Sequence, residues 1–164
     1  MALDDGPVAG AERPILASFL AGQRSMLLVK CAGLTGEQLA ERAVPPSGLS
    51  LLGLLRHMAK VERTWFRQRV GGEPVEPMYD PALGTDADFE DIDPARAEVD
   101  HARLVAEWRL ADAAAAASTL DDTITVRGEV MSVRAVYVHM IQEYAQHNGH
   151  ADLLRERLDG VTGY

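Results

Sequence analysis

The sequence predicts an all-α protein built as a four-helix bundle, and three observations support this class. Four long segments repeat apolar residues at steps of three and four, which is the period of an amphipathic helix. Stretches rich in proline, glycine and polar residues separate them, and we find no convincing run that predicts a strand. The 164 residues are 47% hydrophobic and 25% charged, as in one ordinary globular domain. We therefore expect residues 1–164 to form a single helical domain.

The first predicted helix begins at Pro14 and runs to about Ala32. Proline fits the first turn of a helix, and apolar side chains follow it at helical spacing, namely Leu16, Phe19, Leu20, Leu27 and Cys31. The segment Thr35–Gln38 has the spacing of a capping box, which predicts a short helical turn. This turn must end before Pro45, because the residue preceding a proline is disfavoured in a helix. It serves as a connector.

The second predicted helix begins after Ser50, a natural N-cap, and stops at Gly71. Its apolar face consists of Leu51, Leu54, Leu55, Met58, Val61 and Trp65. From Glu73 to Asp93 the chain has three prolines and no sustained apolar period, so we predict a long surface loop between the second and third helices. Loops of this length often carry function.

The third predicted helix follows Asp93, an N-cap with proline at the first helical position, and runs to about Leu120. A polar turn over residues 121–127 comes next. Ser132 is then the N-cap of a last helix that ends at Gly160. The apolar stripe of this helix consists of Val136, Met140, Tyr144, Ala151, Leu154 and Leu158.

Composition excludes several classes of function. The 16 basic and 25 acidic residues give a net charge of −9, which repels a phosphate backbone, so we expect no nucleic-acid binding. No apolar stretch approaches the roughly 20 residues that a membrane span requires. The single cysteine, Cys31, cannot form an internal disulfide, and the acidic N-terminus does not resemble a signal peptide. The expected location is the cytoplasm.

Histidines gather on the last predicted helix, where His139, His147 and His150 lie within twelve positions. Glu143 and His147 are one helical turn apart on the same face, so both can reach one point. His57 lies near the apolar side of the second helix, where an imidazole without a partner is costly to bury. If the second and fourth helices are neighbours, His57, Glu143 and His147 form an open three-ligand metal site.

Imidazole and carboxylate donors suit Zn²⁺, Ni²⁺, Fe²⁺ or Mn²⁺ and do not select among them, and Zn²⁺ is the ion that we expect first. A different interpretation stays open, because a Glu and a His one turn apart are more often a solvated surface pair. His150 can orient a ligand or line the pocket. For His139 we expect a hydrogen-bonded place in the core or at a pocket rim.

Two segments resemble the DinB/YfiT-like superfamily of metal-binding helical proteins. They are Leu54-Leu-Arg-His-Met-Ala-Lys-Val-Glu62 in the second helix and Glu143-Tyr-Ala-Gln-His-Asn-Gly-His-Ala-Asp-Leu-Leu-Arg-Glu in the last. The resemblance covers nearly the whole chain. Within the superfamily, the chain resembles the actinobacterial branch related to mycothiol-dependent maleylpyruvate isomerases. It implies a four-helix bundle that binds one divalent metal through His57, Glu143 and His147. Many members have histidine where this chain has Glu143.

The resemblance also implies an enzyme that activates a low-molecular-weight thiol, mycothiol, for S-transfer to or isomerisation of an electrophilic substrate. A metal with an open position binds a thiol and stabilises its thiolate, so no protein cysteine is needed. The candidates for moving the proton are His150, His139 and Glu62. Arg56, Arg63 and Arg67 could receive acidic groups of a substrate, but arginines on an amphipathic helix are usually solvated, and this is what we expect of all three.

Alternative functions make different demands on the residues. A hydrolase that uses a metal-bound water needs the same ligands with a general base, and it stays an alternative. So does a non-enzymatic bundle that acts through a partner or as a homodimer. A di-iron carboxylate site needs paired Glu-x-x-His motifs, and one alone is present, at 98–101. Serine hydrolase chemistry fails because residues 48–52 lack the final glycine of a nucleophile elbow.

Overall fold

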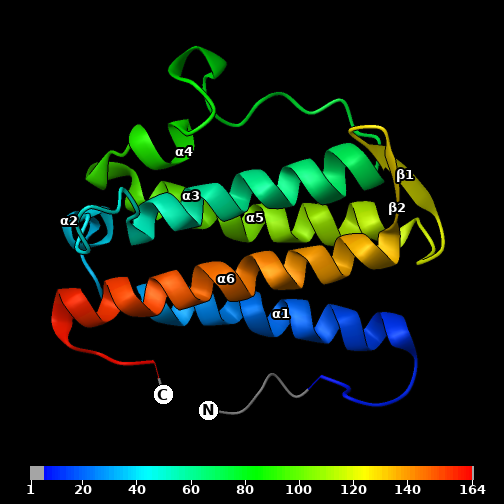
Figure 1. The fold of residues 1–164 in the computed structure, drawn as a ribbon, viewed down its shortest axis with the longest axis horizontal. Helices are drawn as coiled ribbons and strands as arrows, with labels where there is room; N and C mark the ends of the chain where they lie inside the picture. The colour runs from blue at the N-terminus through cyan, green and yellow to red at the C-terminus, as the bar shows by residue number, and fades with distance from the viewer. Residues whose placement is uncertain (1–5, 164) are drawn as a thin grey trace.

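Four long helical segments run side by side in the computed structural model, which describes residues 6–163 (Figure 1). They are α1 (Glu12–Cys31), α3 (Leu51–Glu62) with its π-helical continuation η1 (Arg63–Val70), α5 (Ala97–Ala116) and α6 (Val133–Asp159). The connections contain α2 (Gly36–Ala40), η2 (Pro81–Leu83), α4 (Ala87–Glu90), η3 (Pro94–Arg96), β1 (Thr123–Val126) and β2 (Glu129–Ser132). The described chain is therefore mainly helical, as the sequence predicts.

Side-chain caps fix several helix ends where the sequence predicts them. The hydroxyls of Ser50 and Ser132 accept hydrogen bonds from the backbone N–H three residues further on, at the starts of α3 and α6. Thr35 and Gln38 form the capping box of α2. Gly160 ends α6 with a φ of 76°, a left-handed conformation that glycine adopts without strain.

The segment predicted as a polar turn over 121–127 differs in the structure. It leads into a two-stranded antiparallel hairpin, in which Thr123 pairs with Ser132 and Val126 with Glu129. The expectation of no strand is therefore wrong here. The β-branched sequence Thr-Ile-Thr-Val suits a strand, but four residues are too few for a periodic signal.

The second predicted helix ends where expected but changes its form. Gly71 N donates to the carbonyl of Phe66 at 2.8 Å, a hydrogen bond that spans five residues and defines a π-helical turn. The predicted loop after it also contains regular structure, η2 and α4. The short helix α4 packs closely on α3, where Gly53 has no side chain to keep it away. A Cβ at Gly53 would lie 3.1 Å from the Phe89 ring. The connection therefore contributes buried residues as well as surface.

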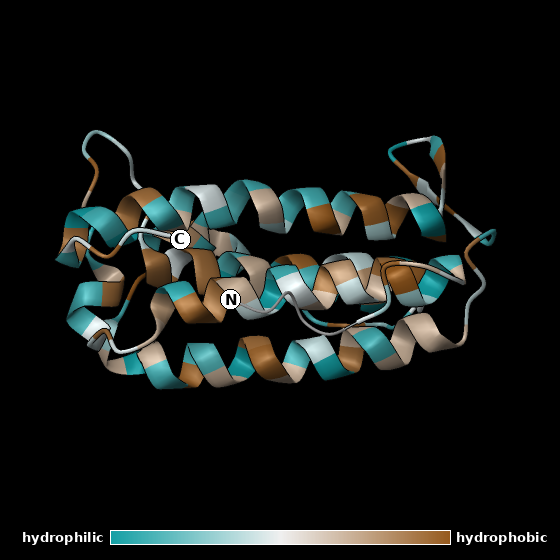
Figure 2. Cartoon of the chain, turned by 90° about the horizontal axis from the view of Figure 1, so that it is seen from below, coloured by the Kyte–Doolittle hydropathy of each residue, from teal (hydrophilic) through white to brown (hydrophobic). Residues whose placement is uncertain are grey.

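Apolar side chains from the inward faces of the long helices form the core. Figure 2 shows hydrophobic and hydrophilic residues alternating around each helix, as expected when one face is buried. Within residues 6–163, no helix has the combined length and apolar character needed to cross a bilayer. Cys31 is buried against this core, and burial raises the pKa of its thiol to about 12. Its thiol therefore stays protonated near neutral pH.

A charged hydrogen-bond network crosses the core at Glu62, which has no exposed surface. Arg24 of α1 donates from Nε and Nη2 to the two carboxylate oxygens at 2.7 and 2.8 Å. Tyr144 of α6 donates to Glu62 Oε1 at 2.8 Å, and Trp108 of α5 donates to the Tyr144 hydroxyl at 2.8 Å. Burial raises the pKa of Glu62, while its hydrogen bonds favour the charged form. The network thus joins all four long helical segments.

We predict that Glu62→Gln destabilises the fold, because the buried guanidinium of Arg24 loses the carboxylate that accepts two of its hydrogen bonds and keeps only Asp112, a largely exposed acid. Losing one member of a buried ion pair costs about 3–5 kcal/mol, and the free energy of unfolding in urea should fall by about that amount. Arg134→Gln is the control, since it breaks ion pairs with Glu12 and Asp121 at the surface. Equal stability of both variants would contradict the role of the network.

Candidate metal centre

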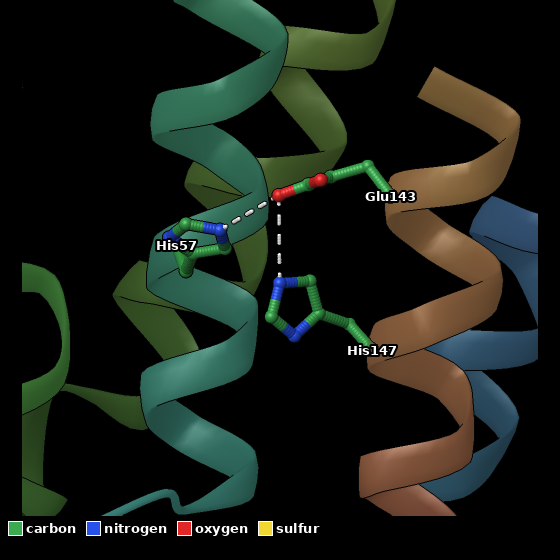
Figure 3. A group of neighbouring side chains, drawn as sticks. All are labelled: His57, Glu143 and His147. Carbon is green, nitrogen blue, oxygen red and sulfur yellow. Dashed lines mark hydrogen bonds and ion pairs between the residues drawn. The ribbon is translucent and has the colours of Figure 1, made fainter. Parts of the chain in front are cut away.

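Three side chains predicted from the sequence meet between α3 and α6 (Figure 3). His57 comes from α3, and Glu143 and His147 come from successive turns of α6. His57 Nε2 lies 3.3 Å from Glu143 Oε1, and His147 Nε2 lies 3.5 Å from the same oxygen. Both imidazoles therefore direct their Nε2 atoms at one carboxylate oxygen. This metal cluster, as we call the three residues, is partly exposed on one side.

The spacing of these atoms fits a divalent metal ion. One donor atom from each residue lies within 4.8 Å of the others. Bonds of about 2.0–2.2 Å in tetrahedral geometry place two ligand atoms about 3.3 Å apart, which is close to the 3.3 and 3.5 Å that separate Glu143 Oε1 from the two Nε2 atoms. Two imidazoles and one carboxylate are common zinc ligands, and three protein ligands leave a position for a small molecule. The residues can thus hold a metal with an open position.

Asp88 of α4, which sequence reasoning missed, lies behind His57. Its Oδ2 is 2.7 Å from His57 Nδ1, and Lys60 Nζ donates to its Oδ1 at 2.9 Å. Burial disfavours the charged form of Asp88, yet the hydrogen bonds from His57 and Lys60 outweigh it and lower the pKa. An ionised carboxylate only accepts hydrogen bonds, so His57 Nδ1 carries the proton. Nε2 is then the ring nitrogen that faces Glu143 and is placed to bind a metal ion.

Arg56 holds α4 against α3. Its guanidinium donates to two backbone carbonyls of α4 at 3.0 Å and to Asp100 Oδ2 of α5 at 3.3 Å. Because Arg56 is 4% exposed, the expectation that it is solvated is wrong. Arg63 and Arg67 are also engaged, since both donate to Glu107 of α5. These arginines position the scaffold around the metal cluster.

His147 has a second neighbour on α6, His150, with 3.3 Å between their Nδ1 atoms. Burial first, and then the nearby His57, lower the pKa of His147 to about 4. Its imidazole is therefore neutral at pH 7, which is the form that binds metal ions. The Phe89 ring stacks on His57 with 4.7 Å between centroids and covers one side of the metal cluster.

Two further sequence candidates, Glu62 and His139, are not brought into the metal cluster. Both carboxylate oxygens of Glu62 accept hydrogen bonds in the core network. His139 lies one turn before Glu143 on α6, and its ring packs on Trp65 with 4.3 Å between centroids. Among the proton-transfer candidates, His150 is the one that contacts a member of the metal cluster in the described part of the chain.

The signal that could have revealed Asp88 is weak. Asp88 lies 31 residues from His57 in a segment with no helical period, and its hydrogen-bond partners come from another helix. An acidic residue in a long connection is usually solvated. The length of that connection was the single feature of the sequence that indicated a functional segment.

We predict that Arg56→Gln loosens α4, because the carbonyls of this short helix lose their donor. Amide hydrogen exchange over residues 87–90 should become about tenfold faster or more, as expected for the loss of a charged hydrogen bond. Arg103→Gln is the matched control, since Arg103 donates to the same Asp100 but not to α4. Unchanged protection of 87–90 in Arg56→Gln would show that other contacts hold the segment.

A family model described as mycothiol-S-transferase matches residues 15–160. The matched range begins in α1, ends just past α6 and includes every residue of the metal cluster. A search of curated proteins and a search of solved structures found no match to this chain.

Proposed function

The chain belongs to the mycothiol-S-transferase family, and we propose that it is a metal-dependent enzyme that joins mycothiol, through its thiol sulfur, to an electrophilic substrate. The proposed dependence on a metal ion is supported by the convergence of His57 Nε2 and His147 Nε2 on Glu143 Oε1. The family match supports the thiol. We further propose that the four long helical segments form the four-helix bundle of the DinB-like class.

His57, Glu143 and His147 would hold the ion, for which we propose Zn²⁺, although Ni²⁺, Fe²⁺ and Mn²⁺ accept the same donors. When bound, such an ion lowers the pKa of a coordinating thiol, which provides thiolate near neutral pH. The side chains perform the remaining tasks. Glu143 supplies a negative charge between the two imidazoles, which offsets part of the charge of the cation.

Two residues outside the metal cluster orient its imidazoles. Asp88 accepts a hydrogen bond from Nδ1–H of His57, and His150 Nδ1 is placed to accept one from Nδ1–H of His147. Each acceptor keeps the proton on Nδ1 and the lone pair on Nε2, where it points into the metal cluster. We therefore assign His150 to the orientation of His147. Glu62, which is enclosed in the core network, serves the scaffold.

The reacting sulfur comes from the small-molecule thiol. Cys31 is excluded as the nucleophile, because its thiol is buried and burial raises its pKa to about 12. In the transfer, the S–H bond breaks and the proton leaves to water on the exposed side of the metal cluster. The electron pair of sulfur forms the new bond to the electrophile, and a leaving group departs with the pair of the broken bond.

A homodimer and a cytoplasmic location stay predictions from the sequence.

We predict that the protein binds about one Zn²⁺ per chain and that His57→Ala abolishes this stoichiometric binding. The variant should keep its helical circular dichroism, because the core does not depend on His57. His139→Ala is the matched control, since it removes a histidine one turn from Glu143 and should retain the metal. Metal content by mass spectrometry decides, and full occupancy in His57→Ala would refute the ligand assignment.

A zinc titration tests the orienting role of Asp88. Asp88→Asn removes the charge but keeps the size of the side chain. Loss of such an outer hydrogen bond typically weakens metal affinity about 10–100-fold, and competition with a chromogenic chelator should show a loss in this range. An unchanged affinity would mean that Asp88 anchors α4 without acting on His57.

We predict that mycothiol binds saturably to the zinc-loaded protein and not to the metal-free protein. Isothermal titration calorimetry measures this directly, with zinc-treated His57→Ala as the control for adventitious metal. Equal binding by both forms would argue against a contact between thiol and metal. Incubation with an electrophile should then yield a thioether that contains mycothiol. Turnover of the electrophile by water, without mycothiol, would instead identify a hydrolase.

A further inference from the structure

A cavity of about 440 Å³ lies between the α3–η1 helix and the connection that follows it. Its lining comes from residues within 60–68 and 75–88, and we call it the connection cavity. Figure 1 shows this connection running back from the end of η1 to α4, which lies beside α3. Volumes of about 300–1,000 Å³ are typical of sites for small molecules. No residue of the metal cluster lines the connection cavity, so it is a separate place in the fold.

Two walls of different chemistry enclose the connection cavity. The α3–η1 helix contributes polar side chains at steps of three and four residues, so they share one face of the helix. These are Lys60, Arg63, Thr64 and Gln68. The connection contributes mainly apolar side chains, among them Val75, Pro77, Met78 and Pro81. A ligand that suits both walls has a polar head and an apolar body.

The two cations of the helical wall keep N–H groups for a ligand. Lys60 Nζ donates to a backbone carbonyl at 2.8 Å and to Asp88 Oδ1 at 2.9 Å. Within residues 6–163 this leaves the third N–H of its ammonium group without an acceptor. Arg63 donates three hydrogen bonds, to Glu107 and to a backbone carbonyl, and a guanidinium has more N–H groups than these. An acceptor inside the cavity can therefore bind both side chains.

Two acids also line the connection cavity, and they limit its positive potential. Asp88 is 1% exposed, and its two oxygens are engaged with His57 and Lys60, which compensate its charge. Glu76 is exposed, and its carboxylate forms no ion pair in the described part of the chain. A ligand with one negative charge therefore fits better than a dianion such as a phosphate monoester.

We propose that the connection cavity binds a small organic carboxylate with an apolar body. The head accepts hydrogen bonds from Lys60 and Arg63, which are stronger than neutral hydrogen bonds because both partners are charged. The body packs on the apolar side chains of the connection. Asp88 lines the same cavity and holds His57. The ligand thus adjoins the support of the metal cluster without entering the metal cluster.

Three probes with one body and different heads test this class of ligand. Phenylbutyrate, phenylbutyramide and phenylbutylamine carry a carboxylate, a neutral amide and an ammonium group. Each is titrated into the full-length protein, both metal-free and zinc-loaded, while the backbone amide resonances are followed by NMR. We expect saturable shifts from the carboxylate at residues 60–68 and 75–88 in both forms. Its affinity should exceed that of the amide about tenfold or more, as expected for charged hydrogen bonds.

Charge variants assign the binding to named side chains. Lys60→Gln should weaken binding of the carboxylate about tenfold and leave binding of the amide unchanged, which shows that the cavity is intact. Glu76→Gln should tighten binding of the carboxylate about two- to fivefold, because it removes a like charge at the surface. Glu90→Gln is the matched control, since Glu90 is an exposed acid of α4 that does not line the cavity.

A variant that fills the cavity tests its place independently of charge. Val75→Trp should abolish binding of both the carboxylate and the amide. Val99→Trp makes the same change on α5, outside the lining, and should bind like the wild type. If Lys60→Gln also lost the amide, its cavity would have collapsed, and Glu76→Gln would then decide the role of charge.

Several results would overturn the proposal. They are an absence of saturable shifts, equal affinities of carboxylate and amide, tighter binding of the amine, and shifts confined to residues 143–147 of the zinc-loaded protein, which would place the carboxylate on the metal. The proposed transferase is tested separately. Carboxylate binding by a protein that performs no transfer leaves the connection cavity standing as a ligand site, and transfer without carboxylate binding refutes this site alone.

Discussion

The buried carboxylate of Glu62 is the point on which the alignment of the helices depends. It accepts hydrogen bonds from Arg24 of α1 and Tyr144 of α6, and Tyr144 in turn accepts one from α5. Glu62 follows His57 by five residues, and Tyr144 directly follows Glu143. A slip of one residue along α6 would rotate Glu143 by about 100° away from His57. The hydrogen bonds that satisfy the core therefore also fix the geometry of the metal cluster.

The connection between η1 and α5 adds a second constraint, because it supplies a buried acid to the outer side of His57. Burying Asp88 would be costly without compensation, and α3 provides that compensation from three residues within little more than one turn. Arg56 binds the backbone of α4, His57 binds one oxygen of Asp88, and Lys60 binds the other. The orientation of a metal-binding imidazole thus depends on a segment that lacks any long helix of its own.

The parts of the structure that the sequence predicts are those with a local physical cause. Ser50, Ser132 and Gly160 act within one helical turn, so the boundaries that they set are visible in the sequence. Glu143 and His147 are also local neighbours, and His57 needed one assumption about which helices meet. Asp88 and the burial of Arg56 depend on contacts across more than 30 residues. No periodic pattern records such contacts, and the hairpin is too short to have one.

The arginines of η1 show how the charges of the site are divided. Arg63 and Arg67 face Glu107 of α5, and their ion pairs with this carboxylate hold η1 against that helix. Arg69 instead lies on Trp65, whose ring packs on His139 of α6. The helix therefore contacts α5 through ion pairs with a buried carboxylate and α6 through packed rings, and both contacts hold the segment that follows His57 in place.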